Sequence, residues 1–124
     1  MGNGTSIGRV RGLGAAHHGP HHWLVQRFTA IGNVVLMSWL LVSLIMLGDY
    51  GHANVVKWLS QPISATAMIL LVISLFWHAR LGLQVVIEDY VRGELARMGA
   101  ILAVKGLCAL LWLSATLAVL RIAV

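Results

Sequence analysis

The sequence has few charged residues. Asp, Glu, Lys and Arg together make up 10% of its 124 residues, whereas soluble domains contain about a quarter. Hydrophobic residues reach 59%, a composition too apolar for a small soluble domain. We therefore expect a protein that lies in a lipid bilayer.

Motifs that carry chemistry are also missing. Cys108 is the single cysteine and lies within an apolar run, so no disulfide can form within the chain. The sequence contains no nucleophile–base pair, metal-binding motif, phosphate-binding loop or dinucleotide fingerprint. Residues 1–19 are rich in glycine and lack an apolar run, which argues against a signal peptide there. We expect no catalytic residue in this chain, and its apolar runs leave no room for a soluble catalytic domain.

Three long apolar runs account for most of the chain, at about residues 28–48, 62–87 and 99–120. Each exceeds the roughly 18 residues that indicate a membrane-spanning helix. As a helix, the second run would be about 39 Å long and must tilt or protrude from a hydrocarbon layer of about 30 Å. The runs predict an all-α membrane protein with three transmembrane helices in residues 28–124. Residues 1–27 would form a cytoplasmic or interfacial segment, and residues 49–61 a short outer loop.

The basic residues lie at the ends of the apolar runs rather than in one patch, although the net charge is +5 and the pI about 10.4. With three spans, one side of the membrane carries Arg9, Arg11, Arg27, Arg92 and Arg97, and the other Lys57 and Arg121. Lys and Arg are enriched on the cytoplasmic side of membrane proteins. We therefore predict a cytoplasmic N-terminus, an outer C-terminus and no nucleic-acid partner.

The end of the second run holds the one histidine that lies within a span. On a helix, His78, Gly82, Val85 and Asp89 share one face, and Gly82 leaves a flat surface beside the imidazole. Ionisable residues within membranes are usually functional, and haem b takes imidazole nitrogen as an axial ligand. Because no span contains a second histidine, a haem held by His78 would be shared with another chain. Asp89 and Tyr90 could offer a proton path and an O–H donor to a quinone carbonyl.

Three other features keep more than one interpretation. The tract from His17 to His22 could bind a metal or form an interfacial segment, and the lack of a nearby Cys or acid favours the second. Arg27 could anchor a helix end to lipid phosphates or bind an acidic group of a cofactor. Arg80 could pair with a neighbouring helix, pair with a cofactor acid, or extend towards the membrane surface.

Two motifs resemble those of the small membrane-anchor subunit of succinate dehydrogenase, respiratory complex II. They are His78-Ala79-x-Leu81-Gly82 followed by Glu88-Asp89-Tyr90-Val91, and His21-x5-Arg27-x-Thr29-Ala30-Ile31. The resemblance implies a cytochrome b type anchor, packed with a second, larger cytochrome b anchor subunit in a bacterial inner membrane. The flavin, iron–sulfur clusters and succinate site would belong to separate flavoprotein and iron–sulfur subunits that the anchors tether.

By this resemblance, His78 is one axial ligand of haem b, and the larger anchor subunit supplies the other. Tyr90 donates to the ubiquinone carbonyl with Asp89 beside it, and Arg27 and His21 lie near the haem propionates. Arg80 replaces a residue that is often apolar or aromatic in the family, so no role transfers to it. Two alternatives remain open: a fumarate reductase anchor that uses menaquinone, and a structural membrane bundle without haem.

Overall fold

The computed structural model describes residues 19–124, which form four helices. They are α2 (Gly19–Leu47), α3 (His52–Leu59), α4 (Pro62–Tyr90) and α5 (Glu94–Ala123). The described residues contain no strand, so the all-α prediction is confirmed. The predicted N-terminal segment lies largely outside the described residues. Its last part, from Gly19, already belongs to α2.

Local sequence explains where the long helices begin and end. Pro62 lies in the first turn of α4, where its missing N–H leaves no hydrogen bond unmade. Gly48 follows α2 with φ of 69°, and Gly93 precedes α5 with φ of 107°. Both values lie in the left-handed region that glycine adopts without strain. The turn at Gly93 is short, and it reverses the chain so that α5 runs back along α4.

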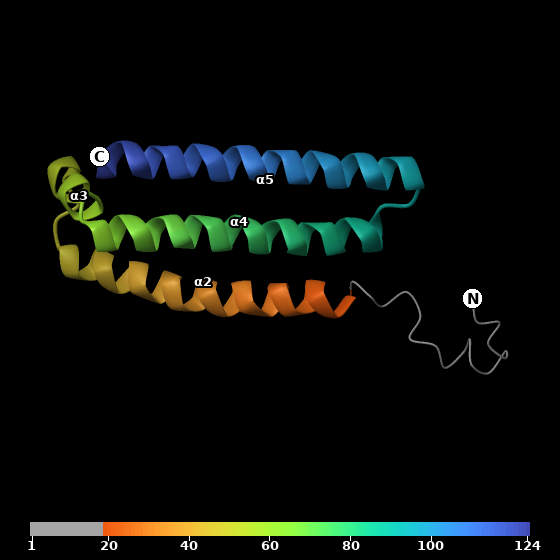
Figure 1. Cartoon of the computed structure of the whole chain (residues 1–124), viewed down its shortest axis with the longest axis horizontal. Helices are drawn as coiled ribbons and strands as arrows, with labels where there is room; N and C mark the ends of the chain where they lie inside the picture. Colours follow the sequence, from red (N-terminus) through yellow and green to blue (C-terminus); the bar gives the residue numbers. More distant parts are fainter. Residues whose placement is uncertain (1–18) are drawn as a thin grey trace, which may run out of the picture.

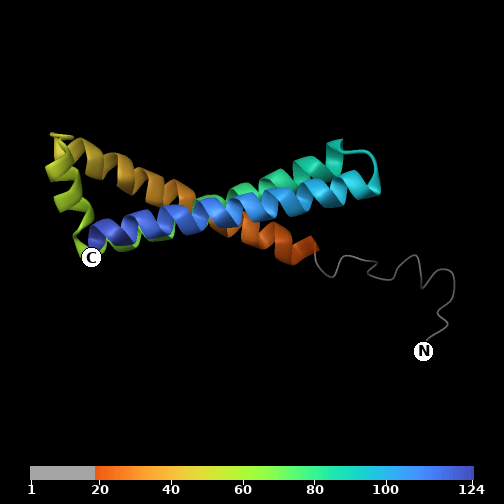
Figure 2. The ribbon, with the colours of Figure 1, turned by 90° about the horizontal axis from the view of Figure 1, so that it is seen from above.

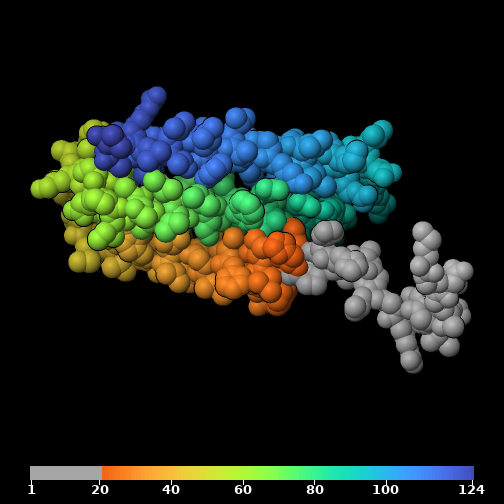
Figure 3. Space-filling model, in the orientation of Figure 1, coloured from red at the N-terminus to blue at the C-terminus, as the bar shows by residue number. Residues whose placement is uncertain are grey.

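The three long helices form a single layer rather than a closed bundle. α4 lies between α2 and α5, which do not contact each other, as Figures 1 and 3 show. Seen from above, α5 runs along α4 while α2 crosses them at an angle (Figure 2). α4 is thus the helix that both neighbours contact, and it carries the predicted site residue His78.

Few side chains are buried within the chain. A small cluster of Leu59, Ala65 and Val119 joins α3, α4 and α5, and no described apolar side chain is less than 2% exposed. Most large apolar side chains on the long helices remain exposed. Three helices, His21–Leu47, Pro62–Tyr90 and Glu94–Ala123, are long and apolar enough to span a membrane. Lipid or other membrane subunits must therefore cover these faces.

The connection between the first two spans is more ordered than the loop that the sequence predicted. The carboxylate of Asp49 accepts hydrogen bonds from the Gly51 N–H at 2.9 Å and from Asn54 Nδ2 at 2.7 Å. This turn leads into α3, which buries Leu59 and stacks Trp58 on Trp39 of α2 at a centroid distance of 5.9 Å. The short helix forms because packing against the ends of its neighbours stabilises it.

Candidate functional site

His78 lies at the contact between α4 and α2. Its Nδ1 is 3.1 Å from the hydroxyl oxygen of Thr29, a residue 49 positions earlier in the chain. Both side chains are partly buried. The structure therefore brings the motif that contains His78 against the motif that contains Thr29.

Small residues let α2 and α4 approach closely around this pair. Ser74, one turn before His78, donates a hydrogen bond to the Thr29 carbonyl at 3.2 Å. A methyl group added at Gly32 would lie 3.2 Å from the Ser74 hydroxyl, closer than most side-chain contacts allow. Small residues and interhelical hydrogen bonds of this kind are typical of membrane helix packing. Together they hold the Thr29 hydroxyl beside the imidazole.

The surroundings of Thr29 determine which imidazole nitrogen carries the proton. The Thr29 hydroxyl lies 2.9 Å from the Val25 carbonyl and 3.0 Å from the Gln26 carbonyl, to which it can donate its single hydrogen. Towards His78 it then acts as an acceptor, so Nδ1 of the neutral imidazole carries the hydrogen. The opposite tautomer would place the hydrogen on Nε2, which has no hydrogen-bond partner among residues 19–124. We assign the Nδ1–H tautomer, which leaves the Nε2 lone pair free.

A groove of about 530 Å³ lies further along α4, towards Tyr90, and neither His78 nor Thr29 lines it. A methyl group added at Gly82 would contact only Gln26 Nε2, at 3.8 Å, so the helix surface there is open. Two polar atoms at the groove are buried without a hydrogen-bond partner among residues 19–124, Nε2 of His22 and Oε1 of Gln26. The residues that line it are His22, Trp23, Gln26, Gly82, Gln84, Val85 and Glu88.

The basic residues predicted near this site lie at its edge. Arg27 is exposed, and its guanidinium lies 4.8 Å from the ring centre of Trp23, which lines the groove. His21 is exposed and does not line the groove, whereas its neighbour His22 does. In the sequence, His22 stands out only as part of a histidine tract. Its spacing of four from Gln26 was the available signal, because residues four apart share a helix face.

Asp89 and Tyr90 lie at the end of α4. Tyr90 is 81% exposed, and Asp89 is also exposed. Tyr90 lies about 18 Å along the helix axis from His78, at about 1.5 Å per residue. Neither side chain forms a hydrogen bond within the described part of the chain, so both are available to a ligand or a partner subunit.

The chain offers single ligands rather than a complete metal site. The described residues contain no group of three or more His, Cys, Asp or Glu side chains that could hold a metal ion. A metal bound at His78 would need further ligands from a cofactor ring or from another chain. This arrangement can supply one imidazole nitrogen at membrane depth, next to a flat helix surface.

Residues 1–120 match the family described as "Succinate dehydrogenase/Fumarate reductase transmembrane subunit". The chain is 39% identical over 102 residues to a succinate dehydrogenase hydrophobic membrane anchor subunit of Rickettsia bellii, covering 82% of this chain and 81% of the relative. The corresponding subunit of Rickettsia conorii is 31% identical, over 84% of this chain and 83% of that protein. A succinate dehydrogenase membrane anchor subunit of Reclinomonas americana is 33% identical, over 70% and 75%. No solved structure matches the chain.

Proposed function

Because the chain belongs to the succinate dehydrogenase/fumarate reductase transmembrane subunit family, we propose that it binds haem b and helps to form a quinone site. It is a multi-pass membrane-anchor subunit of succinate dehydrogenase. Its proposed task is to tether the flavoprotein and iron–sulfur subunits to a bacterial inner membrane. The names of the relatives favour succinate dehydrogenase over fumarate reductase.

The hydrogen bond between His78 and Thr29 is the observation that best supports haem binding. Histidines that bind metals usually donate their other ring N–H to an acceptor, which fixes the tautomer and raises the basicity of the ligand. Here the acceptor is the Thr29 hydroxyl at 3.1 Å, and Nε2 keeps its lone pair. When bound, haem b would supply one-electron transfer. The second axial ligand would come from the larger anchor subunit, since His21 and His22 lie in the first turn of α2 and His52 begins the short helix α3.

The groove suits the planar ring and the propionates of haem b. Gly82 leaves space for a planar ring next to α4, and Arg27 and His21 at the edge could pair with carboxylates. We add His22 to these two, because its Nε2 lacks a partner within residues 19–124. Glu88 is tied to Gln84 by a hydrogen bond of 2.8 Å, which directs the groove's one carboxylate towards its own helix.

Tyr90 and Asp89 are proposed to bind ubiquinone at the end of α4. The phenolic O–H of Tyr90 would donate to a quinone carbonyl, and Asp89 beside it would exchange protons with water. Their exposure supports this role, because a quinone and the iron–sulfur subunit would both have to reach them. In this position the quinone head could receive protons without crossing the bilayer.

We predict that the N-terminus is cytoplasmic and the C-terminus is outside, which places Tyr90 on the cytoplasmic side. The basis is the excess of Lys and Arg on the side that holds Arg92 and Arg97. An alkaline phosphatase fused to the C-terminus should be active in cells, and a cytoplasmic reporter at the same place should not. The opposite result would reverse the topology and move the proposed quinone site to the outer face.

Thr29 provides a test of haem binding in the assembled complex. A reduced-minus-oxidised spectrum with pyridine haemochrome should show b-type haem in the wild type and in Thr29→Ser, which keeps the hydroxyl. Thr29→Val has nearly the same shape but removes the acceptor for Nδ1–H, so the imidazole becomes a weaker donor to ferric iron. The haem midpoint potential should rise, by at most about 65 mV for a lost hydrogen bond of about 0.5–1.5 kcal/mol. A complex without haem would favour a structural bundle, and equal potentials in the two variants would exclude the role of Thr29.

A further inference from the structure

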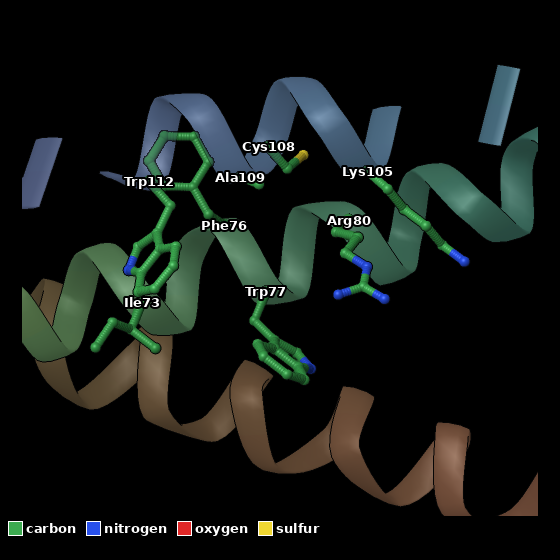
Figure 4. A pocket seen from close by; sticks show the side chains of 8 residues that line it. All are labelled: Ile73, Phe76, Trp77, Arg80, Lys105, Cys108, Ala109 and Trp112. Carbon is green, nitrogen blue, oxygen red and sulfur yellow. The ribbon is translucent and has the colours of Figure 1, made fainter. Parts of the chain in front are cut away.

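A second cleft lies between α4 and α5, and it shares no lining residue with the groove at Gly82. It has a volume of about 170 Å³, and Figure 4 shows side chains from both helices around it. Arg80 lies about 200° around the α4 helix from His78, at about 100° per residue, so the two residues face different surroundings. The cleft is lined by apolar and aromatic side chains and by two cations. Its lining residues include Ile73, Trp77, Arg80, Lys105, Cys108 and Trp112.

The two cations of this cleft lack an acidic partner. The four acidic residues of the chain are Asp49, Glu88, Asp89 and Glu94, and none of them lines the cleft. The Nε of Arg80 is buried and has no hydrogen-bond partner in the structure. The Arg80 guanidinium lies 5.5 Å from the ring centre of Trp77, which holds it in the cleft. Two cations that line one cleft at membrane depth without a carboxylate favour a bound anion.

Arg80 and Lys105 lie at the same depth. Arg80 is about 15 Å from the end of α4, and Lys105 is about 16 Å from the start of α5, at about 1.5 Å per residue. Helices of 29 and 30 residues are about 44 Å long and exceed a hydrocarbon layer of about 30 Å by about 14 Å. If this excess is shared between the two sides, both residues lie about 8 Å below the boundary. Long basic side chains can span that distance to lipid phosphates.

We propose that this cleft binds the phosphodiester of an anionic phospholipid, with an acyl chain along the apolar part of the cleft. Arg80 would hold the phosphate by paired N–H donors, and Lys105 would supply a second positive charge. The net negative charge of the lipid would neutralise the two cations better than a zwitterionic headgroup. Ile73 and Trp112 extend the cleft towards the bilayer centre and suit a lipid tail.

The test uses the purified complex after delipidation in detergent, with dioleoyl phosphatidylglycerol or dioleoyl phosphatidylcholine added back. Native mass spectrometry and thermal unfolding should show that phosphatidylglycerol binds the wild type and raises its Tm more than phosphatidylcholine does. The double variant Arg80→Gln, Lys105→Gln should bind phosphatidylglycerol at least about tenfold more weakly, because charge-assisted hydrogen bonds are lost. Arg80→Lys keeps the charge but loses the paired N–H donors, so its affinity should lie between that of the wild type and that of the double variant.

Matched controls are Arg121→Gln and Lys57→Gln, which remove the same charges outside the cleft and should keep the lipid response. If the double variant does not assemble, the single variant Lys105→Gln is tested in its place. It should also weaken phosphatidylglycerol binding. An unchanged response in these cleft variants would overturn the proposal. So would an equal Tm shift with inorganic phosphate, which indicates an anion site without lipid. A lower Tm of Arg80→Gln without lipid, together with an unchanged lipid response, would instead indicate a carboxylate of another subunit as its partner.

Discussion

Replacing His78 with alanine is expected to abolish or strongly change the haem spectrum of the purified complex. Among the described residues, the imidazole of His78 is the one that lies in the interior of a long helix, because His21 and His22 lie in the first turn of α2. Its removal takes away one of two iron ligands and leaves the Thr29 hydroxyl without its donor. The b-type absorbance per complex should fall several-fold, or the remaining haem should become high-spin with a shifted midpoint potential. A reduced-minus-oxidised spectrum and a redox titration measure both quantities.

The matched control for this variant is His52→Ala. His52 is exposed at the start of α3, which lies at the end of the long helices opposite to the turn between α4 and α5. Its removal should leave the spectrum and the potential unchanged. Succinate oxidation by an artificial dye reports whether the soluble subunits are still assembled and active in each variant. If His78→Ala kept the wild-type spectrum and potential, the residue would be no more than a packing histidine that bonds to Thr29.

Tyr90→Phe is expected to slow succinate–quinone turnover while haem content and dye reduction stay normal. The substitution keeps the aromatic ring and removes one O–H donor to the quinone carbonyl. Such a hydrogen bond contributes about 0.5–1.5 kcal/mol, which corresponds to a roughly two- to tenfold lower kcat/KM for quinone. Steady-state rates with a short-chain ubiquinone, measured next to dye reduction on the same preparation, give the ratio directly.

Tyr50→Phe serves as the matched control for Tyr90→Phe. Tyr50 is also exposed, at 63%, but it lies in the connection before α3, near the other end of the helices. Its quinone kinetics should equal those of the wild type. If Tyr90→Phe also kept wild-type quinone kinetics, Tyr90 would only be an aromatic residue of the membrane interface. If its dye reduction fell in parallel, the hydroxyl would support assembly rather than quinone binding.

The sequence by itself determined the class of the protein and the number of its membrane helices. Transfer of a long apolar run into lipid depends on local composition, so the three runs could be read without knowledge of packing. The two motifs around Arg27 and His78 likewise indicated the family that the comparisons found. The ends of the helices and the short helix α3 could not be predicted as well from the sequence. For α3 the reason is that contacts of Leu59 and Trp58 with other helices stabilise it.

Only the tertiary structure decided which residues face each other across the helices. It identified Thr29 as the partner of His78, placed His22 rather than His21 in the groove, and brought Arg80 and Lys105 to one cleft. These relations depend on the rotation and register of α2, α4 and α5, which follow from close contacts at small residues such as Gly32 and Ser74. Helical periodicity predicts which residues share a face of one helix, but the angle between two helices is fixed by side-chain packing along their whole contact.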